Sequence, residues 1–221
     1  MVADMPKARG WLASPAAGRG PASWIVGLAG AIAATSFLIF AWPVALLSCL
    51  LGWTMLAIAV VDAHRFIVPD ILSLPAIPAG LAVTWLLDDG YTGHSLTLEH
   101  LGAAVLGGAL LYAIKELYFR WRDREGLGLG DVKLAAAAGA WTGLAGLGHV
   151  LLLASLLAIG YVLILNARDL RSLSATTAIA FGVFLAPAIW FVWCAKGSIT
   201  MIRQTTMVPP CITLRRSIPG S

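Results

Sequence analysis

Long apolar runs follow one another through most of this 221-residue chain. A helix needs about 20 predominantly apolar residues to cross the hydrocarbon core of a bilayer, where its backbone must satisfy its own hydrogen bonds. Hydrophobic residues make up 59% of the chain and charged residues 12%, whereas a soluble domain carries about 25% charged residues. The mean hydropathy is +0.86. The sequence therefore predicts an all-α integral membrane protein, built as a polytopic bundle of transmembrane helices.

Polar or helix-breaking intervals separate seven apolar runs, at 24–42, 44–61, 71–87, 101–119, 132–144, 149–165 and 176–194. Pro43 divides the first two, because proline interrupts a helix. The fifth and sixth runs could form one helix, but about 34 residues would overshoot a bilayer, which favours two spans. We expect about seven spans, with a short cytoplasmic N-terminal segment at 1–23, a membrane domain at 24–195 and a flexible C-terminal tail at 196–221.

The positive charges predict which ends of the spans face the cytoplasm. Lys and Arg occur in the N-terminal segment and in the intervals 62–70, 115–133 and 166–175, whereas the interval 88–100 has none. Cytoplasmic loops carry an excess of these residues, so this pattern places the N-terminus and the three basic intervals in the cytoplasm. The tail disagrees, because a seven-span chain leaves its four basic residues outside: Lys196, Arg203, Arg215 and Arg216.

Signals for a metal, a cofactor or a nucleic acid are weak. The three cysteines, Cys49, Cys194 and Cys211, lie far apart without a CxxC pair, which predicts neither a zinc site nor a disulfide framework. The glycines near 128 match no phosphate-binding pattern, and the aspartate that follows them would repel phosphate. The formal net charge of +4 is better explained by membrane topology. We expect no metal, no cofactor and no nucleic-acid partner.

Two aspartates, Asp62 and Asp131, fall where an apolar span meets a cytoplasmic interval. Insertion of an aspartate costs about 2.5–3.5 kcal/mol at the centre of a membrane helix and less near the interface, so such residues usually line a polar cavity or have a function. Two carboxylates brought together share a proton, which leaves one as a base and one as an acid. Such a pair can activate water against a peptide carbonyl and protonate the leaving amine.

Helix capping is the alternative explanation for these carboxylates. Asp70 fits it well, because it follows Pro69 and precedes an apolar run, and Asp131 could also cap the helix that begins near Val132. Residue type and position alone therefore leave both explanations open.

The segments around the aspartates resemble the two signature segments of the type IV prepilin peptidases. The first is Asp62-x7-Asp70, which ends in Ile-Val-Pro-Asp. The second is Glu-Gly-Leu-Gly-Leu-Gly-Asp-Val-Lys at 125–133, which contains the family's GxGD element. A third segment, at 179–186, resembles the family's PFGPFL-like stretch, with Ala180 and Val183 where prolines are common. The resemblance extends from about residue 44 to 195.

This resemblance implies an intramembrane aspartic endopeptidase, which removes the leader peptide of type IV prepilins or pseudopilins at the cytoplasmic face of the bacterial inner membrane without a metal. It implies Asp62 and Asp131 as the catalytic residues. Four other residues would bind substrate or support the site: Gly128, Gly130, Lys133 and Asp70. The implied partners are the prepilin or pseudopilin substrate, membrane lipid, and the pilus or type II secretion machinery.

One departure from the family concerns the front of the chain. Many members carry two CxxC pairs in a cytoplasmic domain and also N-methylate the new pilin terminus with S-adenosylmethionine. This chain has no CxxC pair and so resembles the shorter members. Zinc binding and N-methyltransferase activity are therefore not expected.

Other functions remain possible for a chain with this pattern. A proton- or cation-coupled small membrane transporter would also place carboxylates in the membrane, although the internal repeats typical of transporters are not evident. A non-enzymatic scaffold of a secretion machine would tolerate loss of both aspartates. A presenilin-like protease shares the GxGD element, but this chain reads Leu185-Ala-Pro187 and has no Pro-Ala-Leu motif.

Overall fold

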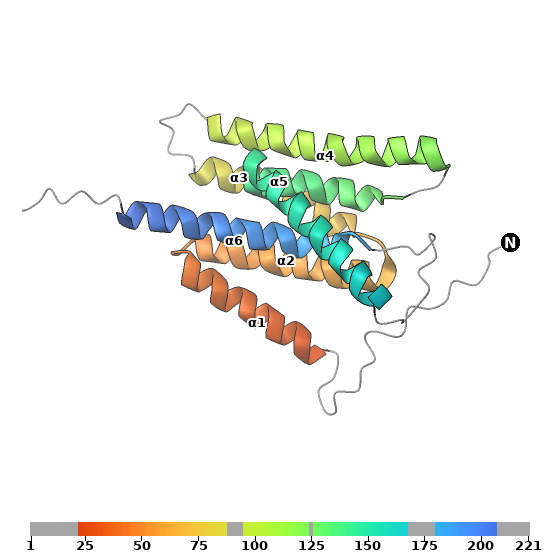
Figure 1. Ribbon diagram of the computed structural model, residues 1–221. Coiled ribbons are helices and arrows are strands. Elements are labelled where there is room, and N and C mark those ends of the chain that lie inside the picture. Colours follow the sequence, from red (N-terminus) through yellow and green to blue (C-terminus); the bar gives the residue numbers. More distant parts are fainter. Residues whose placement is uncertain (1–21, 88–94, 124–125, 168–179, 207–221) are drawn as a thin grey trace, which may run out of the picture.

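A computed structural model describes residues 22–87, 95–123, 126–167 and 180–206. These residues form six α-helices and no strand. The helices are α1 (Ala22–Ile39), α2 (Val44–Arg65), α3 (Asp70–Leu87), α4 (Ser95–Arg122), α5 (Leu129–Ala167) and α6 (Gly182–Thr206). Most of them lie side by side along one common direction, as Figure 1 shows. The predicted all-α helical bundle is confirmed.

Four helical segments are long and apolar enough to cross a membrane: Val44–Arg65, Asp70–Leu87, Leu96–Arg122 and Leu129–Leu165. Two shorter apolar helices lie within α1 and α6, at Ser23–Ile39 and Gly182–Ser198. Large apolar side chains such as Leu38, Val105 and Ile164 are exposed on the outside of the bundle, as a lipid-facing surface requires. Helix α6 continues to Thr206, beyond the residue at which the sequence predicts the membrane domain to end.

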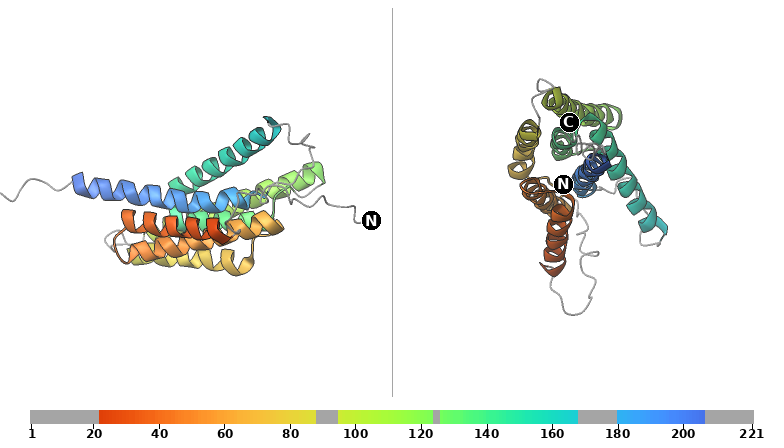
Figure 2. Two further views of the ribbon diagram at one scale, coloured as in Figure 1. Left: turned by 90° about the horizontal axis from the view of Figure 1, so that it is seen from below. Right: turned by 90° about the vertical axis from the view of Figure 1, so that its left-hand side faces the viewer.

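Helix α5 consists of two helical segments that meet at Gly143, whose φ of 66° and ψ of −175° are not helical. Glycine adopts a positive φ without the strain that a Cβ would cause. We call the segments α5a (129–142) and α5b (144–167). In Figure 1 the light-green α5a runs from right to left, and the teal α5b returns obliquely from left to right. Figure 2 shows α5b leaning away from the other helices.

This reversal agrees with the preference for two segments over one long helix, but it shifts their boundary. The sequence places the interruption at 145–148, whereas the chain turns at Gly143, within the run predicted at 132–144. The region around the turn is rich in Ala and Gly and contains no charged residue to mark it. The carbonyl groups at the turn are instead satisfied by side chains from other helices, which a local pattern cannot show.

Small residues bring α4 and α5a into close contact. A Cβ added to Gly107 would lie 2.6 Å from the carbonyl oxygen of Ala135, and one added to Gly139 would overlap the backbone of Ala103. In lipid, where the hydrophobic effect adds little between helices, such close approach supplies van der Waals contact. This contact fixes α5a, whose first turn carries Asp131, against α4.

Valine at position 107 is expected to separate α4 from α5a. Overpacking of this kind costs about 1–3 kcal/mol, so the Gly107→Val protein should melt at a lower temperature in detergent. Gly102→Val is the matched control, because it lies on the same helix and an added Cβ there meets no atom within 4 Å. Equal melting temperatures for the two variants would contradict the close packing of α4 on α5a.

Candidate active site

Asp62 lies in the last turn of α2, close to where that helix stops. Phe66 adopts a left-handed conformation with φ of 54°, and its N–H donates to the Asp62 carbonyl oxygen at 2.8 Å. This closes the helix and directs the chain into the short connection to α3. The Asp62 residue is only 4% exposed, so its carboxylate points into the bundle and not toward the outside.

Asp131 is the third residue of α5 and is 7% exposed. Its own N–H donates to the carbonyl oxygen of Gly128 at 3.2 Å, and the backbone N–H of Gly128 donates to its carboxylate. A side chain that reaches back to the residue before a helix satisfies one of the free amides of the first turn. Because α5 begins at Leu129, Asp131 lies inside its first turn and is not the N-cap of a helix starting at Val132, as the sequence allows. Its carboxylate also reaches a second aspartate.

Gly182, the first residue of α6, is where the two carboxylates meet. A Cβ added to Gly182 would lie 2.7 Å from Oδ2 of Asp62 and 3.2 Å from Oδ1 of Asp131. Asp62 Oδ2 and Asp131 Oδ1 therefore lie next to the same backbone position, which brings the two carboxylates close to each other. The structure brings together the two aspartates that the sequence predicts as a pair, although they are far apart along the chain.

The N-terminus of α6 faces this pair. The backbone N–H groups of Gly182 and Val183 are directed at the Asp62 carboxylate. Amides in the first turn of a helix have no partner within the helix and carry partial positive charge, so they suit a carboxylate. Within the described part of the chain, Asp62 Oδ2 has no hydrogen-bond partner. Burying an oxygen without a hydrogen-bond donor costs free energy. Such an oxygen is expected at a site where a reactant supplies the donor.

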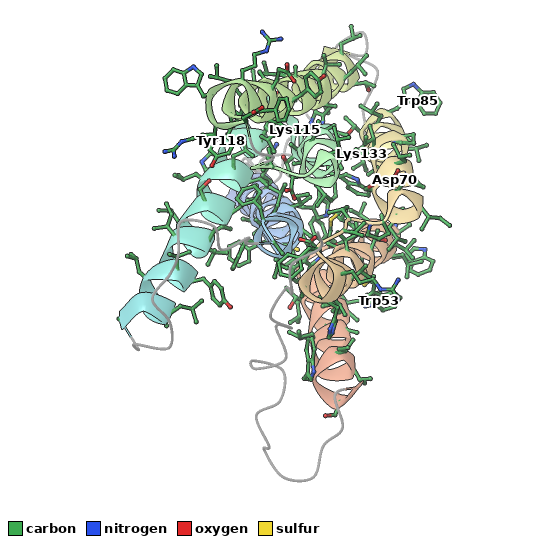
Figure 3. The ribbon with its side chains drawn as sticks, turned by 90° about the vertical axis from the view of Figure 1, so that its right-hand side faces the viewer. Trp53, Asp70, Trp85, Lys115, Tyr118 and Lys133 are labelled. Atoms are coloured by element: carbon green, nitrogen blue, oxygen red, sulfur yellow. The ribbon has the colours of Figure 1, made fainter. Side chains whose placement is uncertain are left out.

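The four predicted supporting residues make different contacts. Lys133 Nζ donates to Asp70 Oδ1 at 2.6 Å, which ties the first turns of α5 and α3 together. Figure 3 labels both residues on these neighbouring helices. A Cβ on Gly130 would overlap Val68 in the α2–α3 connection, whereas one on Gly128 would lie 3.7 Å from Asp131 Oδ2. Asp70 is thus not a third member of the carboxylate pair.

Two contacts at this site were not predicted from the sequence. One is the ion pair between Asp70 and Lys133, and the other is the approach of Gly182 to both aspartates. Gly182 lies within the third segment of the resemblance, at 179–186, which was a signal for its position but not for its contact. Among the described residues, no group of three His, Cys, Asp or Glu side chains could hold a metal ion.

Residues 49–163, more than half of the chain, match the type IV leader peptidase family. The chain belongs to this family. The matched region contains Asp62, Asp70 and Asp131, and it ends before Gly182. The family inferred from the two aspartate segments is therefore confirmed.

Curated relatives of this chain carry the name prepilin leader peptidase/N-methyltransferase. The Aeromonas salmonicida (strain A449) protein is 35% identical over 167 residues, which cover 74% of this chain and 54% of the relative. The Pseudomonas aeruginosa protein is 36% identical over 146 residues, which cover 64% of this chain and 46% of the relative. The Escherichia coli (strain K12) protein is 36% identical over 132 residues, which cover 60% of this chain and 55% of the relative. The chain spans about half the length of these curated relatives. No solved structure matches it.

Proposed function

We propose that this chain is an intramembrane aspartic endopeptidase that removes the leader peptide from type IV prepilins or pseudopilins. The observation that carries the proposal is the convergence of two buried carboxylates, Asp62 and Asp131, on Gly182. Membership of the type IV leader peptidase family supports a peptidase, and the names of the relatives support prepilins as the substrate class.

The chemistry follows from a pair of carboxylates that shares one proton. The ionised carboxylate takes a proton from a water molecule, whose oxygen attacks the carbonyl carbon of the scissile peptide bond. The protonated carboxylate donates its proton to the carbonyl oxygen as the tetrahedral intermediate forms. In the collapse of that intermediate the C–N bond breaks as one carboxyl group protonates the leaving nitrogen. The other carboxylate takes the proton of the hydroxyl group that becomes the new carbonyl, so the pair again holds one proton. Each aspartate is needed in both steps.

The proposed location is the inner membrane of a bacterium, with the carboxylate pair near the cytoplasmic face. Arg65 ends α2 only three residues after Asp62, and Lys133 follows Asp131 by two residues. Such positive charges favour the cytoplasmic side. A prepilin or pseudopilin would present its leader there while its apolar helix stays in the lipid. Through this substrate the enzyme would serve a pilus or a type II secretion machine.

Cleavage by the purified protein tests the proposal. In detergent, with a full-length prepilin and with EDTA present, we expect release of the leader at a single bond, read by mass spectrometry. The rate should be unchanged by the chelator, because carboxylates alone supply the acid and the base. Two results together would contradict the peptidase and favour a transporter: prepilin and pseudopilin substrates that stay intact, and a proton flux into proteoliposomes that depends on Asp62.

A further inference from the structure

The turn at Gly143 leaves backbone groups without partners inside α5. The last carbonyl groups of α5a and the first amides of α5b have no helical partner, and within a bilayer such groups must be satisfied by protein. Side chains of two other helices supply the partners. Lys196 Nζ of α6 donates to the Thr142 carbonyl oxygen at 2.6 Å, and His100 Nδ1 of α4 donates to the Ala140 carbonyl oxygen at 2.9 Å.

Glu99 of α4 serves the other side of the same turn. Its Oε1 accepts a hydrogen bond from the N–H of Leu144, the first residue of α5b, at 3.3 Å. Its negative charge also interacts with the positive charge of Lys196. A Cβ on Gly143 would lie 2.8 Å from His100 Nε2 and 3.2 Å from Glu99 Oε1. We call Glu99, His100 and Lys196 the turn cluster, because the three side chains close around this turn.

The turn cluster is joined to the carboxylate pair by two helical segments. Helix α6 begins at Gly182, beside both aspartates, and reaches Lys196 after four turns. Segment α5a begins with Asp131 in its first turn and ends at Thr142. With a rise of about 1.5 Å per residue, each segment covers about 16–21 Å between its two contacts. The two segments therefore touch at the carboxylate pair and again at the Lys196–Thr142 hydrogen bond.

We propose that Lys196 is a positioning residue that fixes the axial register of α6 against α5a and thereby holds Gly182 and its amides against the two carboxylates. This inference rests on the proposed peptidase function. At one end α6 places Gly182 and its amides against Asp62, while α5a places Asp131 against the same glycine. A shift of α6 along α5a would move Gly182 and its amides away from this position, because Asp62 lies on α2 and Asp131 on α5a, and neither moves with α6.

The chemistry of Lys196 suits this role. Its ammonium group donates to a carbonyl oxygen of another helix, so the contact depends on the length of the side chain and on its charge. Lys196→Met retains the apolar stem and removes the donor. Lys196→Arg retains a donor and a charge, so it should restore most of the contact.

Kinetics of leader release by the purified protein test the role of Lys196. We expect Lys196→Met to lower kcat about tenfold or more, because small misplacements of catalytic groups have effects of this size. We expect KM to change little, and Lys196→Arg to recover most of the loss. His149→Leu is the matched control, since it removes a hydrogen bond to Ala145 within the same helix. An unchanged kcat for Lys196→Met, or no recovery with arginine, would overturn the proposal.

A distance measurement tests the register without any substrate. Nitroxide labels at Leu129 and Phe191, both exposed, report the position of α5a relative to α6 in a cysteine-free protein. Electron paramagnetic resonance should give one narrow distance distribution, which Lys196→Met shifts or broadens and His149→Leu does not. An identical distance distribution in the Lys196→Met protein would contradict the proposal that Lys196 fixes the register of α6 against α5a. Failure of the wild type to cleave prepilin, with the distance shift present, would instead count against the proposed peptidase.

Discussion

Alanine at position 182 is expected to lower kcat/KM for prepilin cleavage about 10²-fold or more, while the helical bundle stays folded. The added Cβ would lie 2.7 Å from Asp62 Oδ2 and 3.2 Å from Asp131 Oδ1, and the shorter distance is one that real Cβ atoms essentially never show. The α6 backbone has little freedom to retreat, because Leu185, Ala186 and Ile189 are fully buried. The carboxylates must therefore move apart, away from the position that the proposed mechanism needs for sharing a proton.

Gly160→Ala is the matched control for this variant. Gly160 is also a helical glycine, and an added Cβ there meets no atom within 4 Å. Alanine favours a helix over glycine by about 1 kcal/mol, so neither substitution should lower the melting temperature through the backbone. Measurement of leader release and of thermal unfolding on the same preparations separates the two effects. Wild-type cleavage by the Gly182→Ala protein would show that the glycine is not packed against the carboxylates.

The helical bundle was predictable because membrane insertion constrains sequence strongly. Each span needs a long apolar run, and the basic intervals between runs are read directly from the residues. The turn at Gly143 was predictable only in outline. The need for two segments follows from length, but its position depends on contacts from His100 and Lys196, which come from other helices. A hydrophobic pattern records only the local chain.

The candidate site shows the same division between local and distant information. Asp62 and Asp131 were predicted as a pair because each occurs in a recognisable local segment. Their contact with Gly182 depends on how α6 packs between α2 and α5, which no local pattern specifies. The sequence predicts that Lys196 is the first residue of the C-terminal tail, because the last apolar run ends just before it. The structure places it within α6, bonded to Thr142.

Asparagine in place of Asp62 or Asp131 is expected to abolish leader release. An amide has nearly the same shape as a carboxylate but can neither take a proton from water nor donate one as an acid. General acid or base catalysis contributes about 10²–10⁴-fold for each group, and in the proposed mechanism both groups act in both steps. The fold should persist, because replacing a buried carboxylate with a neutral amide lowers the cost of burial.

Asp70→Asn is the control for the two asparagine variants. It shows whether removal of any aspartate near the site lowers leader release, or only removal of Asp62 or Asp131. Asp70 is exposed and pairs with Lys133, and exposed ion pairs contribute about 0.2–1 kcal/mol. We therefore expect Asp70→Asn to retain most of the wild-type cleavage. A loss as complete as that of the other two variants would move Asp70 into the catalytic machinery.

The most direct measurement is the rate of leader release from one prepilin by four purified proteins at equal folded concentration: wild type, Asp62→Asn, Asp131→Asn and Asp70→Asn. The predicted result is cleavage by the wild type and Asp70→Asn, and no cleavage by Asp62→Asn or Asp131→Asn. Cleavage at the wild-type rate by a folded Asp62→Asn or Asp131→Asn protein would contradict the aspartic pair.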